Sequence, residues 1–351
     1  MFLALKEIKK EKVRSALIIS MIVLIGYLIF MLTSLALGLA QQNTDAINSW
    51  DAKRITLNSN ANVDMRQSFL TKKQVGNLSK QEALIGETSA VAKADSHKQL
   101  SAIFIGLNAS QFIYQNLDVT AGRKVHDNHE VVVDTAFKTE GYKLGSTFKL
   151  NDDNRNYKIV GFTQNAKLNI APVVYGQMSD WRTLRNITAG PIGSAVISQN
   201  ANYNNDTSGA KTYSKQHVID KLPGYQAQNM TFLMMIGFLM VISLIIIAVF
   251  LYILTLQKLP NYAVLRAQGV PSKMLVGATL SQSVLLVIGG LVVATALTVV
   301  TAWVIPSCVP IAFDVPALSG VGIGLIVMAM IGSLIPIKSV LNVDPVSVIG
   351  G

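Results

Sequence analysis

The side chains best suited to metal or covalent chemistry are few in this sequence and lie far apart along it. Among the four histidines, His126 and His129 have the spacing i, i+3, but acidic and amide residues surround them. Such a polar run is more typical of a solvated turn than of a metal site. Cys308 is the single cysteine, which excludes an intrachain disulfide and a thiolate metal cluster. Because no P-loop, HExxH, nucleophile elbow or paired-cysteine motif occurs, the sequence predicts neither a catalytic centre nor an intrinsic cofactor.

Half of the 351 residues are hydrophobic and only 14% are charged, which is too apolar for an ordinary soluble protein. Four uncharged stretches exceed the roughly 20 residues that cross a bilayer as a helix. These predicted spans are residues 15–39, 230–256, 274–305 and 317–337. A signal peptide is the alternative for the first, but its apolar run is about twice the usual 7–15 residues. Since no span carries an ionisable side chain, the sequence does not predict a carrier driven by protons or sodium.

Residues 41–227 differ completely in composition and predict an independently folded α+β domain. The stretches HEVVVDTAF, STFKLNDD, NYKIVGFT, AIFIGL and PVVYGQM predict strands, and KKQVGNLSKQEALIG can begin as a helix. Because this domain lies between the first two spans, it must face one side of the membrane as a single block.

The positions of the basic residues predict the orientation in the membrane. Five precede the first span, in an amphipathic helix over residues 1–14, and Lys338 opens the tail 338–351. Lys258, Arg266 and Lys273 lie in a short elbow, residues 257–273, whereas the link 306–316 has none. This distribution of basic residues predicts that both termini and the elbow are cytoplasmic. It also predicts that the link 306–316 is an outer turn and that the inserted domain is extracytoplasmic. The net charge of +10 is therefore assigned to orientation and membrane lipid, not to nucleic acid.

The same order of elements resembles the permease family that includes the macrolide exporter MacB and the cell-division protein FtsX. The elbow NYAVLRAQGVPSKML resembles the family segment E-I-G-x-L-R-A-x-G-x-S. GYKLGSTFKL and NYKIVGF resemble repeats of the family's external domain, and VDPVSVIGG resembles its ending. The resemblance implies an α-helical membrane protein with four transmembrane helices and an α+β extracytoplasmic domain inserted between helices 1 and 2. It also implies a multi-pass plasma-membrane homodimer that binds two copies of a separate ATP-binding subunit.

In that family the elbow would seat in the ATPase, so ATP is bound by the partner and the permease itself is not an enzyme. The implied coupling positions are Asn261, Leu265, Arg266 and Gly269. Asn261 departs from the family's glutamate. As an alternative, Arg266 is an ordinary positive anchor on the cytoplasmic side.

Within the family, LPGYQAQNMTFLMMIG, FLYILTLQK and the IGG terminus resemble HrtB-like permeases, the haem-exporting branch of Gram-positive bacteria. That resemblance implies haem as substrate between helices 1 and 2, with Met31 at the position of a methionine ligand and Gln228 where the branch has glutamate. An amide is a poorer iron ligand than a carboxylate, so phenolate and thioether groups nearby are alternative ligands. The candidate haem-binding residues are Tyr27, Met31, Tyr225, Gln228, Met230 and Met234.

Alternative interpretations stay open both for the methionines and for the cargo. Methionines in membrane helices are more often packing residues than ligands, and Ser34 with Gly38 predicts a helix-contact face. The cargo is haem, or an antimicrobial peptide or a lipid, while an FtsX-like mechanotransmitter would control a cell-wall hydrolase and carry nothing. Trp303 is predicted to anchor the membrane interface.

Overall fold

The computed structural model describes residues 12–95, 97–305 and 309–341, which form two compact units. The helical unit contains the chain up to Gly38 and from Met230 onwards, and the sheet-rich unit contains Leu39–Asn229. Most of the predicted amphipathic helix 1–14, Cys308 and most of the tail 338–351 lie outside the described residues.

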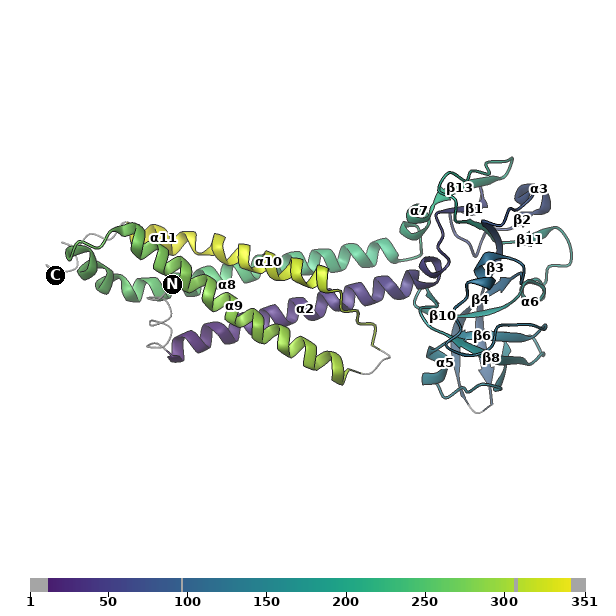
Figure 1. Cartoon of the computed structure of the whole chain (residues 1–351), viewed down its shortest axis with the longest axis horizontal. Coiled ribbons are helices and arrows are strands. Elements are labelled where there is room, and N and C mark those ends of the chain that lie inside the picture. The colour runs from purple at the N-terminus through teal and green to yellow at the C-terminus, as the bar shows by residue number, and fades with distance from the viewer. Residues whose placement is uncertain (1–11, 96, 306–308, 342–351) are drawn as a thin grey trace. The chain divides into compact units, whose positions relative to one another are not determined.

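Four helical segments among the described residues are long and apolar enough to cross a membrane. They are α2 (Lys12–Ser49), α8 (Tyr225–Ala267), α9 (Ser272–Val304) and Val315–Leu341, which comprises α10 (Val315–Gly332) and α11 (Leu334–Leu341). The sheet-rich unit lies between the first and second of them in the sequence, as predicted. Within the helical unit, the start of α2 and the α8–α9 turn lie at the same end (Figure 1).

The first and last helical spans differ from the predicted ones for identifiable reasons. The first helix continues ten residues past residue 39, because Ala46 and Ile47 are fully buried in a core of the sheet-rich unit and this packing extends the helix. The last span is interrupted at Ser333, between α10 and α11. Pro336 lacks the N–H that would bond to the carbonyl of Gly332, so a continuous helix loses a hydrogen bond at this point.

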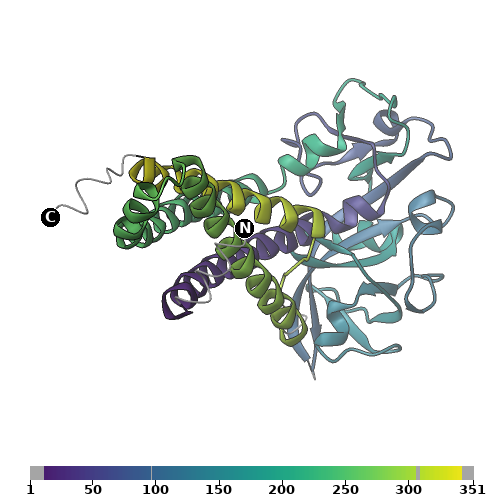
Figure 2. The same cartoon turned by 60° about the vertical axis from the view of Figure 1, so that its left-hand side comes forward.

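The helical unit packs around close contacts between small residues. A Cβ at Gly290 of α9 would lie 2.5 Å from Ile22 Cγ2 of α2, and one at Gly26 would lie 3.3 Å from Ala294 Cβ. Small residues let helix backbones approach where no hydrophobic force acts between helices in lipid. In both views α10 lies beside α9 (Figures 1 and 2). The shared core consists of Ile18, Ile22, Ile29, Phe30, Ile247, Leu251, Leu254, Leu286, Val287, Leu291, Ala294, Leu325 and Ala329.

The predicted helix-contact face at Ser34 and Gly38 receives a turn and not a helix. The amide of Ala312 donates to the carbonyl oxygen of Ser34 at 3.0 Å. A Cβ at Gly38 would lie 2.2 Å from the carbonyl oxygen of Pro310. The pair of small residues therefore seats the turn between α9 and α10 against α2.

The sheet-rich unit is built on an 11-stranded sheet, with a separate pair of short strands, β2 (Leu70–Thr71) and β11 (Pro191–Gly193). The strand order is β13-β1-β12-β3-β4-β10-β6-β8-β5, with β7 paired to β3 and β8 and β9 paired to β10. The large sheet comprises β1 (Arg54–Asn58), β3 (Glu82–Ala94), β4 (His97–Leu107), β5 (Ala121–Gly122), β6 (Glu130–Asp134), β7 (Thr147–Leu150), β8 (Tyr157–Thr163), β9 (Lys167–Leu168), β10 (Ala171–Gln177), β12 (Ala195–Ser198) and β13 (Ala210–Ser214). The five predicted strands correspond to β6, β7, β8, β4 and β10, which confirms the α+β assignment.

Short helices complete this unit: α3 (Lys72–Val75), α4 (Phe112–Gln115), α5 (Ala136–Thr139), α6 (Met178–Leu184) and α7 (Lys215–Asp220). Successive residues of a strand point to opposite faces, and alternate residues of β3 and β4 accordingly belong to two separate hydrophobic cores. One core contains Ile85 and Ile105 together with Trp50, next to the end of α2. The other contains Phe104 and Trp181, the latter carried by α6.

One acidic side chain of the sheet is buried, and one of its carboxyl oxygens has no hydrogen-bond partner among the described residues. Glu87 of β3 is 1% exposed, and its Oε2 accepts no hydrogen bond from the described residues. Burial, with a smaller contribution from Asp64, raises the pKa of Glu87 to about 8, against the opposing charges of Arg66 and Arg185. The carboxyl is therefore protonated in the folded protein at neutral pH.

We expect Glu87 to make the protein less stable as the pH rises. The folded state holds this proton more tightly than the unfolded chain, whose glutamate titrates near 4.5. Raising the pH from 4.5 towards 8 deprotonates the unfolded chain first, so the free energy of unfolding falls across that window. Glu87→Gln keeps the neutral shape and should remove this fall. Melting curves at pH 5 and pH 8 test this, and parallel pH dependence in wild type and variant would contradict it.

Candidate functional site

The predicted haem-binding residues fall into two sets that belong to different units. Tyr27 and Met31 lie on α2, and Met230 and Met234 lie on α8, all within the helical unit. The hydroxyl groups of Tyr27 and Thr301 are 3.0 Å apart, and the Tyr27 ring packs at the edge of the helical core. The three methionines are not members of that core. Met31 is half-buried, while Met230 and Met234 are 54% and 56% exposed.

Tyr225 and Gln228 instead belong to the sheet-rich unit, although they open α8. The Tyr225 ring packs against the core that contains Trp50. Gln228 Oε1 accepts from Asn43 Nδ2 at 3.4 Å, and the same donor lies 2.8 Å from the carbonyl oxygen of Leu39. Gln228 Nε2 is buried with no acceptor among the described residues. Gln228 thus joins the first turn of α8 to α2, a contact that the sequence analysis did not predict.

The predicted elbow, residues 257–273, is largely a continuation of α8. The helix passes through Pro260 and ends only at Ala267, eleven residues past the predicted span 230–256. An interior proline costs about 3 kcal/mol in helix stability, but neighbouring residues are held by tertiary contacts. Tyr262 is buried, and Lys258 Nζ donates to Gln282 Oε1 of α9 at 2.8 Å.

The α8–α9 turn is a Schellman motif, a helix end in which two backbone bonds close over a residue of left-handed conformation. Gly269 has φ +91°, its amide donates to the Arg266 carbonyl at 3.0 Å, and the Val270 amide donates to the Leu265 carbonyl at 3.0 Å. The side chains of Leu265 and Val270 pack on the same small cluster, which also contains Leu275 and Val340. Glycine at position 269 is therefore required by the backbone, independently of any partner.

The four predicted coupling residues differ in solvent exposure at this turn. Asn261 and Gly269 are exposed, whereas Leu265 and Arg266 are half-buried. The small cluster joins the turn to the start of α9 and to Val340 of α11. Residue type and spacing did not predict the inner part of this arrangement. Lys258 contacts Gln282 there, and the hydroxyls of Tyr262 and Thr279 are 3.5 Å apart.

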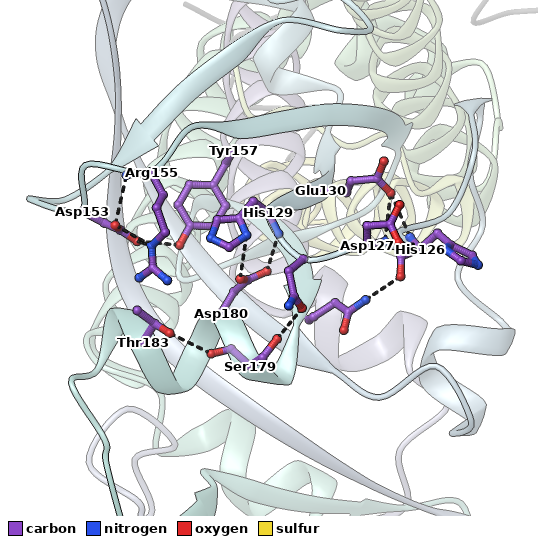
Figure 3. Close-up of polar contacts among 12 residues, drawn as sticks. His126, Asp127, His129, Glu130, Asp153, Arg155, Tyr157, Ser179, Asp180 and Thr183 are labelled. Carbon is purple, nitrogen blue, oxygen red and sulfur yellow. Dashed lines mark hydrogen bonds and ion pairs between the residues drawn. The ribbon is translucent and has the colours of Figure 1, made fainter.

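The histidine pair of the sheet-rich unit takes part in a structural attachment (Figure 3). Asp180 of α6 is buried, and its Oδ2 accepts from the His129 amide at 3.0 Å. Ser179 Oγ and Asn128 Oδ1 are 2.7 Å apart, which fixes the same loop to α6. His126 is exposed, as expected for a solvated turn. The described residues include no group of three His, Cys, Asp or Glu side chains placed to hold a metal ion.

Residues 233–345 match a family model described as the FtsX-like permease C-terminal domain. This match identifies residues 233–345 as an FtsX-like permease domain, and the four apolar spans and the full-length relatives support a permease component of an ABC-type transporter.

Over its full length the chain is similar to proteins whose names describe the permease HrtB of a hemin transport system. The protein of Staphylococcus haemolyticus is 26% identical, and that of Staphylococcus epidermidis strain RP62A is 22% identical, with 100% of this chain and 99% of each relative covered. Two solved structures align with part of the chain. The first is the periplasmic region of MacB from Actinobacillus actinomycetemcomitans, with 16% identity, 49% of this chain and 93% of that chain covered, and a TM-score of 0.35. The second is the extracellular domain of the noncanonic ABC-type transporter YknZ from Gram-positive bacteria, with 10% identity, 46% of this chain and 98% of that chain covered, and a TM-score of 0.35.

Proposed function

We propose that this permease exports haem from the plasma membrane of a Gram-positive bacterium, driven by a separate ATP-binding subunit. The observation that carries the proposal is the similarity to named hemin permeases over the whole chain. The absence of ionisable side chains from the four predicted spans supports it, because a cargo that enters sideways from the bilayer needs no charged path across it.

The proposed assembly is a homodimer bound to two ATPase copies, with the α8–α9 turn as the ATPase contact. Lys258, Arg266 and Lys273 surround this turn, and the basic residues before the first span favour the same, cytoplasmic side. The sheet-rich unit is then extracytoplasmic. This orientation also places the turn between α9 and α10, which carries no Lys or Arg, at the outer surface.

Of the candidate ligands, the thioethers have the better case in this structure. Met230 and Met234 are exposed on α8 and Met31 is half-buried, and none of the three belongs to the helical core. Tyr27 and Gln228 already contact Thr301 and Asn43. We therefore propose that Met31 is one ligand of the haem iron and that Met230 or Met234 replaces the glutamate ligand of the haem-exporting branch, since thioether ligation of haem iron is established chemistry.

A haem titration of the purified permease is expected to give a saturable shift of the Soret band that weakens in Met31→Ala. Loss of one metal ligand or its support commonly lowers affinity by about 10–100-fold, so a rise in Kd of that order is expected. Gln228→Ala should have a smaller effect, because its amide contacts Asn43. Met274→Ala is the matched control, since Met274 is an exposed methionine in the first turn of α9.

If the wild-type permease shows no saturable shift, haem is not its cargo. A peptide or lipid cargo, or an FtsX-like mechanical role, would then replace the proposal, and membership of the FtsX-like permease family would stand. If Met274→Ala weakens binding as much as Met31→Ala, haem binds without the proposed ligand.

A further inference from the structure

The hairpin formed by β9 and β10 has an unusual residue at its tip. Leu168 pairs with Ala171, so Asn169 and Ile170 alone form the turn, with φ +49° and +68°. Turns of this kind favour Asn followed by Gly. A β-branched residue at positive φ is a genuine outlier, because its side chain is crowded against the backbone in this conformation. The strain indicates that the Ile170 side chain has a use that glycine could not serve.

That use is not packing within the sheet-rich unit. Ile170 is 44% exposed, while its neighbour Leu168 is fully buried. Among the described residues of this unit, the other large hydrophobic side chain with comparable exposure is Leu144, at 49%. The residues from Leu168 to Pro172 include no charged side chain, so the tip presents apolar and amide groups.

The tip is fixed to α2 near the end of its apolar segment. The Ile170 amide donates to the Gln42 carbonyl at 3.1 Å, and the Asn169 amide donates to the Asn43 carbonyl at 3.2 Å. The apolar run of α2 ends at Leu39, three residues earlier, which is about 4.5 Å along a helix.

The second membrane helix, α8, indicates the same depth for the hairpin tip. Asn43 contacts Gln228, and the apolar run of α8 begins two residues later, at Met230. The headgroup region of a bilayer extends about 5–7 Å beyond the hydrocarbon on each side. Both helices therefore place the hairpin tip at headgroup depth.

We propose that the tip of the β9–β10 hairpin contacts the lipid surface, with Ile170 inserted at the boundary between headgroups and hydrocarbon. This contact, with the two amide bonds to α2, would fix the distance of the sheet-rich unit from the bilayer. The proposal depends on membrane insertion alone and not on the identity of the cargo.

The test uses the full-length permease in nanodiscs, with Cys308→Ser and a single environment-sensitive dye on Ile170→Cys. The control is Ala109→Cys, at the opposite end of β10. Leu107 pairs with Gln177 there, seven residues from the tip and roughly 20 Å along the strand. Ile170 contacts Gln42, and Trp50 Nε1 donates to Tyr175 OH, so β10 runs in the same direction as this end of α2, and Ala109 lies on the side away from Leu39.

Lipids carrying a quencher near the headgroup should quench the dye at position 170 at least about twofold more than at position 109. Ala171→Cys gives a second reading at the tip should Ile170→Cys fold poorly. Equal quenching at the tip and the control would overturn the proposal. A blue-shifted but unquenched dye at the tip would also overturn it, because the tip would then contact protein, such as a second copy of the chain.

Discussion

Arg266→Glu is expected to abolish the proposed haem resistance conferred by the permease and its ATPase, while the protein still inserts in the membrane. Arg266 lies in the last turn of α8, where a positive charge is favourable and a negative one unfavourable by about 0.3–1 kcal/mol. This dipole contribution is small against the roughly 5–15 kcal/mol by which folded proteins are usually stable. Reversing a charge at the proposed ATPase contact costs several kcal/mol at an interface, so the loss should appear in coupling.

Three measurements separate coupling from folding in this variant: growth in haem, the amount of permease in membranes, and stimulation of ATP hydrolysis in the reconstituted complex. Arg266→Lys keeps the charge but removes the planar fork, and should retain part of the activity. Wild-type resistance in Arg266→Glu would remove the α8–α9 turn from the coupling mechanism and leave Arg266 as a positive anchor.

The sequence predicted features whose cause is local and missed those that depend on contacts across the chain. The four spans follow from long uncharged runs, and β6 and β8 follow from short β-branched runs between turn residues. The path of α8 through Pro260 could not be predicted from residue type. Its stabilising contacts come from α9, for example Gln282, which lies 24 residues beyond Lys258.

In the candidate site, too, the features that depend on contacts across the chain could not be predicted from the sequence. The resemblance to HrtB-like permeases selected Met31 and Gln228, but the exposure and the partners of each side chain decide what it can do. Gln228 contacts Asn43 across 185 residues of sequence, and this contact gives it a structural role that no local pattern indicates. Similarly, Glu87 looks like an ordinary polar residue of a strand, and only the tertiary structure buries it and raises its pKa.

Trp181→Ala is expected to destabilise the sheet-rich unit by about 3–5 kcal/mol, the usual cost of truncating a fully buried tryptophan. Trp181 has no exposed surface, and its side chain occupies space above two glycines of the sheet. A Cβ at Gly86 would lie 2.3 Å from the Trp181 ring, and one at Gly106 would lie 2.7 Å from its Cβ. These glycines let α6 lie close to β3 and β4, so the cavity left by alanine cannot be filled from the sheet side.

Trp181→Phe is the matched control because it keeps most of the ring. It removes the Nε1 donor that lies 3.0 Å from the Glu87 carbonyl, and Ser194 Oγ remains 3.3 Å from that oxygen. Losing one such bond costs about 0.5–1.5 kcal/mol, so Phe should lower the melting temperature of the full-length permease much less than Ala. Equal shifts for the two variants would mean that the hydrogen bond, and not the filled volume, holds α6 on the sheet.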